Sequence, residues 1–187
     1  NLSEWAYYFC DGCPLGYSAI GGQTLNPYGR KVFETGGSSA GSGVATAANY
    51  AVATVGSETA GSIISPSSQN SVVGLKPTIG VVSGDGIVPI SHTLDTAGPM
   101  TKNVTDNAIL LDAMTSVNYS TINEDSVTLS SKKFGVYKRL LNDSIYKSTI
   151  KFIEDSGATI VELDEPELPL DGFLTLLNLE MKDGVPS

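Results

Sequence analysis

The pattern of apolar and polar positions predicts helices and strands that alternate along the chain. The stretch from Ser42 to about Thr54 is rich in Ala and Val, which is typical of a buried helix, and Ser42 can cap its start. Short apolar runs at 53–56 and 72–75 predict strands. Apolar and small residues alternate over 80–90 around a Gly-Asp-Gly turn, which predicts a β-hairpin.

The C-terminal half of the chain carries clear helix signals. Residues 103–117 predict a helix with Asn103 as its N-cap, and residues 143–155 predict another that Asp143 caps and Gly157 ends. The side chains expected to face inward are Val104, Ala108, Leu111 and Met114 or Thr115 in the first helix, and Ile145, Thr149, Phe152 and Ile153 in the second.

Strands are expected on either side of the second of these helices, at 134–137 and 158–163, and a further helix over 173–181. A strand–helix–strand crossover implies a parallel pair of strands. The sequence therefore predicts an α/β fold.

Two loops rich in glycine and serine stand at either end of the Ala- and Val-rich stretch, at 36–43 and 57–66. Glycine allows a positive φ and lets the backbone approach a ligand closely. Exposed backbone N–H groups in such loops can hold an anion or a developing oxyanion. We therefore expect the chain to bring a serine from each loop to one place.

The charge and the few cysteines and histidines of the chain limit which partners and metal sites are expected. The chain has 187 residues and a formal charge of −9, which argues against a nucleic-acid partner. It contains no apolar run long enough to span a membrane and no visible signal peptide. Cys10 and Cys13 are interpreted as loop thiols or a small local disulfide, and the functional alternatives are a redox pair or half of a zinc site. His92, the only histidine, is interpreted as an ordinary loop residue, so no metal site and no His-dependent triad are expected.

Two motifs carry a resemblance to a known family. The first is Gly36-Gly37-Ser38-Ser39-Ala40-Gly41-Ser42, and the second is Gly56-Ser57-Glu58-Thr59-Ala60-Gly61-Ser62-Ile63, with Ser38 and Ser62 24 positions apart. Both motifs and this spacing resemble the amidase signature family of Ser–Ser–Lys hydrolases. Further matches lie at 74–78, 86–89 and 95–99, and residues 1–6 resemble the peptide-amidase branch.

The resemblance implies a mixed central β-sheet with helices on both faces, of which this chain is expected to form part. We interpret residues 1–187 as a single incomplete amidase domain and the chain as an internal piece of a longer protein. Residues 1–117 would form the signature core with both serines, 118–131 a polar surface linker, and 132–187 a βαβ-like unit.

The resemblance also implies roles for individual residues. Ser62 is the expected nucleophile, and Ser38, preceded by a cis Gly37–Ser38 bond, is the serine that passes a proton between nucleophile and base. Backbone N–H groups of Thr59, Ala60 and Gly61 match the family's oxyanion hole. The family's catalytic lysine lies upstream of the motif at 1–6, so no position here matches it, and the chain alone is expected to be a poor catalyst or none. No cofactor is implied.

Two residues carry what the resemblance says about substrate. Many family members have Arg where this chain has Ile64, so the sequence favours a peptide-amide or an aryl or alkyl amide over a small carboxylated substrate. Asp95 is expected to shape the wall of the site, with a turn-forming role as the equal alternative. The expected partner is a small-molecule or peptide amide.

Three other functions are weighed against the amidase hypothesis. The first is a non-catalytic binding or scaffold protein with an amidase fold, and the second is the glutamine-hydrolysing subunit of a tRNA amidotransferase, which Ile64 disfavours. The third is nucleotide binding by the loop at 36–43, which lacks the Gly-Lys-Ser/Thr of a P-loop. The sequence leaves oligomeric state and compartment open.

Overall fold

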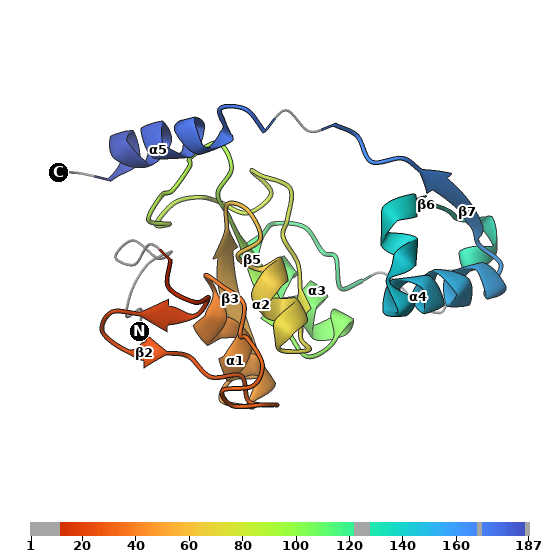
Figure 1. Ribbon diagram of the computed structural model, residues 1–187, viewed down its shortest axis with the longest axis horizontal. Helices are drawn as coiled ribbons and strands as arrows, with labels where there is room; N and C mark the ends of the chain where they lie inside the picture. The colour runs from red at the N-terminus through yellow and green to blue at the C-terminus, as the bar shows by residue number, and fades with distance from the viewer. Residues whose placement is uncertain (1–11, 122–127, 168–169, 186–187) are drawn as a thin grey trace. The chain divides into compact units, whose positions relative to one another are not determined.

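The computed structural model describes residues 12–121, 128–167 and 170–185 (Figure 1). The chain divides into two compact units, one formed by 1–120 with 172–187 and the other by 121–171. The residues expected as a βαβ-like unit are therefore shared between the two, because the helix that ends the chain belongs with the first unit. Within the described ranges, no helix is both long and apolar enough to cross a membrane.

A three-stranded antiparallel sheet is at the centre of the first unit. Its strands are β3 (Ala53–Glu58), β5 (Thr96–Thr101) and β4 (Val73–Gly74), in the spatial order β3-β5-β4. Gly56 of β3 lies opposite Gly98 of β5. The expected strands near 53–56 and 72–75 are confirmed, and β5 is an addition that the sequence pattern did not predict. A separate small hairpin pairs β1 (Tyr17–Ser18) with β2 (Gly22–Gln23).

Three helices pack around this sheet (Figure 1): α1 (Ala40–Ala47), α2 (Ile64–Gln69) and α3 (Val104–Met114). The prediction for α1 was wrong at both ends. The helix starts before Ser42, whose hydroxyl instead donates to the Val55 carbonyl at 2.8 Å, and it stops at Ala47, just before Asn49 with its φ of 62°.

The start of α3 is confirmed. Asn103 Oδ1 accepts a hydrogen bond from the Asp106 N–H at 2.8 Å, as an N-cap does. Leu111 is buried as expected, and Asn107 is buried beside it. Val104 was expected to face inward but is 66% exposed, because it is the first residue of the helix.

The predicted hairpin at 80–90 is wrong. All of these residues are described, and none of them belongs to a strand. The turn is present, since the Ile87 N–H donates to the Gly84 carbonyl at 3.1 Å. Pro89 has no N–H to give to a ladder, so the segment leaves the turn as a loop.

The core of the first unit lies where the strands meet the helices. Ile63 and Met100 are completely buried there, and the buried Asn70 and Asn26 tie the surrounding loops together. The side-chain amide of Asn70 donates to the carbonyl groups of Thr35 and Pro66, both at 2.8 Å. Buried polar groups need such partners, so these bonds fix the loop before α1 against α2.

The second unit contains the predicted parallel strand pair. Strands β6 (Lys133–Tyr137) and β7 (Thr159–Leu163) flank α4 (Ser144–Asp155), with short 3-10 turns η2 (Leu129–Ser131) and η3 (Lys138–Asn142). Asp143 caps α4 by accepting from the Tyr146 N–H at 2.8 Å, and Gly157 ends it with a φ of 94°. Both cap predictions are confirmed.

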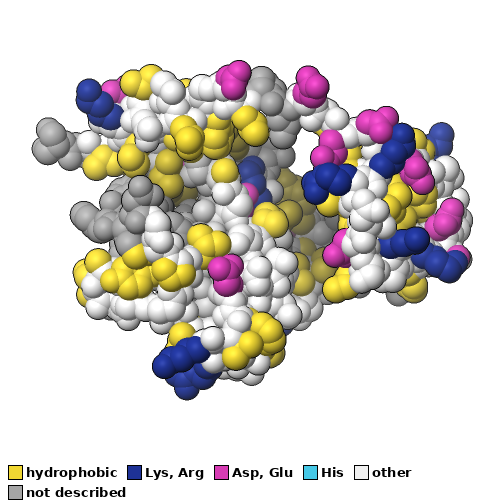
Figure 2. Space-filling model, in the orientation of Figure 1, with side chains coloured by type: hydrophobic (Ala, Val, Ile, Leu, Met, Phe, Trp, Pro, Cys, Tyr) yellow, Lys and Arg dark blue, Asp and Glu magenta, His cyan; other side chains and the backbone are white. Residues whose placement is uncertain are grey.

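The inward face predicted for α4 is only partly correct. Ile145 is 76% exposed and Phe152 is 70% exposed, because a two-stranded sheet is too narrow to cover the whole apolar stripe. Charged side chains of both signs lie on the face of this unit that Figure 2 shows. Exposed ion pairs in the unit include Lys138–Asp164 and Lys151–Asp155.

The first unit also includes α5 (Phe173–Gly184), which follows the second unit in sequence. Its Glu180 is 8% exposed and contacts the loop that precedes β5.

Candidate active site

The two glycine- and serine-rich loops meet at one small pocket in the first unit. Ser38 precedes α1, and Ser62 lies between the end of β3 and the start of α2. Both line the pocket, together with Ser57, Glu58, Thr59, Ile87, Val88, Ile90 and Asp95. The expectation that each loop contributes a serine to one place therefore agrees with the structure.

The first loop reaches the second through close backbone contacts. Gly36 has a φ of 62°, and a Cβ on it would lie 2.7 Å from the Pro66 backbone nitrogen, so a side chain does not fit. The Gly37–Ser38 peptide bond is cis, as the family resemblance implied. The Ser39 N–H then donates to the Ser62 carbonyl at 3.2 Å.

Glu58 organises the turn that carries Ser62. This residue is 6% exposed, and its carboxylate accepts hydrogen bonds from three backbone N–H groups. Oε1 accepts from Gly61 at 2.7 Å, and Oε2 accepts from Ile63 at 2.7 Å and Ile64 at 3.0 Å. Bonds to a charged acceptor are the stronger kind, so the carboxylate fixes the residues on both sides of Ser62.

Glu58 is not among the site residues predicted from the sequence. An acidic residue just before a glycine turn that opens a helix is the available signal, because free N–H groups at a helix start attract carboxylates. The same bond changes the expectation for Gly61. Its N–H is already donated to Glu58, so in this structure the predicted oxyanion donors are reduced to the N–H groups of Thr59 and Ala60.

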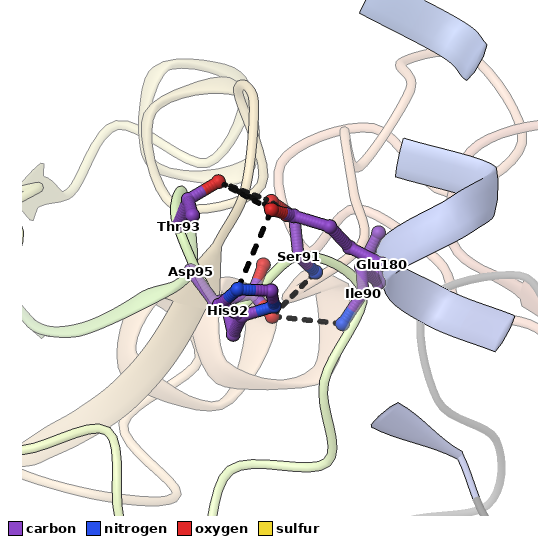
Figure 3. A network of polar contacts seen from close by, with 6 residues as sticks. All are labelled: Ile90, Ser91, His92, Thr93, Asp95 and Glu180. Carbon is purple, nitrogen blue, oxygen red and sulfur yellow. Dashed lines mark hydrogen bonds and ion pairs between the residues drawn. The ribbon is translucent and has the colours of Figure 1, made fainter. Parts of the chain in front are cut away.

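Asp95 lines the pocket and also binds the loop beside it (Figure 3). Its Oδ1 accepts from the Thr59 hydroxyl at 2.5 Å, and its Oδ2 accepts from the N–H groups of Ile90 at 2.7 Å and Ser91 at 2.9 Å. One carboxylate thus links the loop of Ser62 to the apolar side of the pocket. Asp95 therefore lies in the wall of the pocket, and the Gly98-Pro99 that follows it belongs to strand β5 and not to a turn.

The apolar part of the pocket comes from residues that were not among the predicted site residues. Ile87, Val88 and Ile90 line it. Ile64, the residue expected to contact substrate, is the first residue of α2, is 48% exposed, and is not among the lining residues. The family match at 86–89 was a signal for this loop, but only its tertiary position shows that it lines the pocket.

The pocket contains no lysine or histidine among the lining residues that the structure describes. The His92 side chain is 71% exposed, which agrees with its interpretation as a loop residue. Within the described part of the chain, no cluster of three His, Cys, Asp or Glu residues could hold a metal ion. Cys13 is disulfide-bonded, while Cys10 lies outside the described residues.

Known proteins resemble this chain over nearly its whole length. The family model described as Amidase matches residues 1–172. A probable amidase from Arabidopsis thaliana is 39% identical over 182 residues, which cover 96% of this chain and 35% of that protein.

Solved structures agree with this match. The crystal structure of an amidase family protein from Bacillus anthracis superposes with a TM-score of 0.88 at 38% identity, covering 99% of this chain and 40% of that one. The peptide amidase from Stenotrophomonas maltophilia superposes with a TM-score of 0.79 at 38% identity, and the match covers 98% of this chain and 42% of the peptide amidase chain. The chain thus has the α/β fold of these proteins and spans well under half of their length.

Proposed function

This chain belongs to the amidase family, and we propose that the protein containing it hydrolyses a carboxylic amide through an acyl intermediate on Ser62. The observation that carries the proposal is the pocket shared by Ser38 and Ser62, with Glu58 holding the turn of Ser62 in place. A serine nucleophile needs such a fixed backbone, because the attacking oxygen must stay within reach of the carbonyl carbon.

In the proposed reaction the Ser62 oxygen attacks the amide carbonyl carbon. The N–H groups of Thr59 and Ala60 donate to the oxyanion of the tetrahedral intermediate. Ser38 passes the Ser62 proton to the base and returns a proton to the leaving nitrogen, so that ammonia or an amine departs. Water then attacks the acyl group on Ser62 and releases the acid. The base is the lysine that the family resemblance implies, which no residue of this chain matches.

The walls of the pocket support an amide with an apolar group next to the scissile bond. Ile87, Val88 and Ile90 offer apolar contact, whereas the Asp95 carboxylate is already occupied by three hydrogen bonds within the protein. The likeness to a peptide amidase supports a peptide amide as the narrower choice. No cofactor or metal is part of the proposal.

Release of ammonia from a C-terminally amidated peptide with an apolar last residue tests the proposal, using the full-length protein that contains this chain. Ser62→Ala is expected to abolish release. Ser68→Ala, which removes an exposed hydroxyl from α2, is the matched control and is expected to retain it.

Free glutamine and a set of alkyl and aryl amides are assayed in parallel. Release from glutamine alone would replace the proposal with the amidotransferase alternative. Folded protein that releases nothing from any of these amides would favour the non-catalytic alternative. Equal rates for Ser62→Ala and the unmodified protein would remove Ser62 as nucleophile.

A further inference from the structure

The loop that forms one side of the pocket is held by a residue far away in sequence. Glu180 of α5 lies against residues 91–93 (Figure 3). Its carboxylate accepts hydrogen bonds from the hydroxyl groups of Ser91 and Thr93, the latter at 2.9 and 3.0 Å, and its Oε1 lies 3.6 Å from His92 Nε2. Ser91 is completely buried and Glu180 nearly so. The Glu180 carboxylate therefore binds the hydroxyl groups of Ser91 and Thr93 and lies close to the His92 ring.

The same loop is bound on its other side by Asp95. Ser91 gives its hydroxyl to Glu180 and its N–H to Asp95, and Asp95 in turn accepts from the Thr59 hydroxyl. Thr59 lies three residues before Ser62 and lines the same pocket. A continuous path of hydrogen bonds therefore runs from α5 to the loop of the proposed nucleophile.

Removing the acceptor at position 180 would affect more than one contact. The buried Ser91 hydroxyl would lose its carboxylate acceptor and keep only the Thr93 hydroxyl, 3.3 Å away, so a charge-assisted hydrogen bond would be replaced by a weaker neutral one. The Thr93 hydroxyl would lose the same acceptor, so the loop would be free to shift, and Ile90 and Asp95 of the pocket would shift with it. Catalysis is sensitive to such shifts, since a misplacement of about 1 Å can lower a rate about a hundredfold.

We propose that Glu180 is a positioning residue of the amidase site: it fixes the pocket wall at 87–95 and, through Asp95, the place of Thr59. This inference rests on the proposed function, because it concerns the geometry needed for that reaction. Glu180 acts through Ser91 and does not itself line the pocket.

Three variants of the full-length protein test the role of Glu180 in the rate. Glu180→Ala is expected to lower kcat/KM for the amide by about tenfold or more. Glu180→Gln keeps an oxygen that can accept from one hydroxyl, so it is expected to recover most of this loss. Asp183→Asn changes an exposed carboxylate of the same helix and should leave the rate unchanged. A wild-type rate for Glu180→Ala would overturn the inference.

A double-mutant cycle separates this role from a general loss of stability. Glu180→Ala and Asp95→Asn act on one path of hydrogen bonds, so the double variant is expected to lose clearly less activity than the product of the two single losses. Asp183→Asn combined with Asp95→Asn should show no such coupling. Independent effects of the Glu180 and Asp95 changes would contradict the proposed path.

Hydrogen exchange gives a readout that does not depend on catalysis. In Glu180→Ala the backbone amides of Ile90 and Ser91 should exchange faster than in the unmodified protein. In Glu180→Gln, which keeps an acceptor for only one of the two hydroxyl groups, they should exchange faster by a smaller factor, and in Asp183→Asn their exchange should be unchanged. Unchanged protection in a folded Glu180 variant would overturn the inference. If the unmodified protein hydrolyses no amide, the proposed function fails, and this measurement still decides whether Glu180 fixes the loop.

Discussion

Replacing Glu58 with glutamine tests the idea that one carboxylate fixes the turn of Ser62. The change keeps the size of the side chain and removes its charge. Glutamine has a single acceptor oxygen, whereas Glu58 uses one oxygen for Gly61 and the other for both Ile63 and Ile64. The variant is therefore expected to keep at most two of the three bonds.

The structure gives the size of the effect. If the amide oxygen of Glu58→Gln takes the place of Oε2, its NH₂ group faces the Gly61 N–H, and that bond is lost at a cost of about 1.5–3 kcal/mol. The two remaining bonds change from charged to neutral acceptors, at about 1 kcal/mol each. The variant no longer has to bury a charge, which offsets part of this loss. We expect the free energy of unfolding to fall by about 2–4 kcal/mol.

Urea unfolding of the full-length protein measures this difference, with Glu34→Gln as the control because Glu34 is exposed. The rate of amide hydrolysis should fall as well, and kcat should change more than KM, because the turn carries the proposed nucleophile rather than the binding wall. If Glu58→Gln lies within about 0.5 kcal/mol of the control and retains its rate, the reasoning is refuted, since such a difference is typical of an ordinary surface substitution.

Three further changes have expected outcomes. In Gly98→Ala, the new Cβ would collide with a backbone carbonyl oxygen, so urea unfolding should show that the free energy of unfolding falls by at least about 2 kcal/mol. Gly84→Ala, where the Cβ would have open space, should lose little stability. Equal losses in the two variants would contradict the packing of β5. Asn103→Ala removes the α3 cap and should cost about 1 kcal/mol by the same measurement, and no change would contradict the cap. The hydrogen bond from Ser91 holds the pKa of the Glu180 carboxyl below its ordinary value. The ionised Glu180 carboxylate therefore stabilises the fold at neutral pH, and this stabilisation is lost as pH falls through the lowered pKa. The difference in Tm between the unmodified protein and Glu180→Gln should shrink in acid. A difference that stays constant with pH would contradict this expectation.

Local signals in the sequence were enough to place several elements. Asn103 and Asp143 cap α3 and α4 because a cap needs only a side-chain oxygen and an N–H three residues later. The two loop motifs were enough to predict that Ser38 and Ser62 approach each other, since the short helix and strand between them fix the path of the chain.

Features that depend on distant partners could not be predicted in this way. The sequence predicts Ser42 as a helix cap, yet its hydroxyl donates to the carbonyl of Val55 in the next strand. Glu180 contacts Ser91 across 89 positions of sequence, so no periodicity connects them. Phe152 fits a helical apolar stripe, but the strand pair of its unit is too narrow to cover it.

The central claim is that the acyl group of the substrate is carried by Ser62. It is tested most directly by mixing the full-length protein with a chromogenic aryl amide, quenching in acid during the first turnover, and locating the added mass by peptide sequencing in a mass spectrometer. We predict an acyl group on Ser62 that is absent from the Ser62→Ala variant and present in Ser68→Ala. An acyl group on a different residue, or continued hydrolysis by Ser62→Ala with no covalent adduct, would contradict the account.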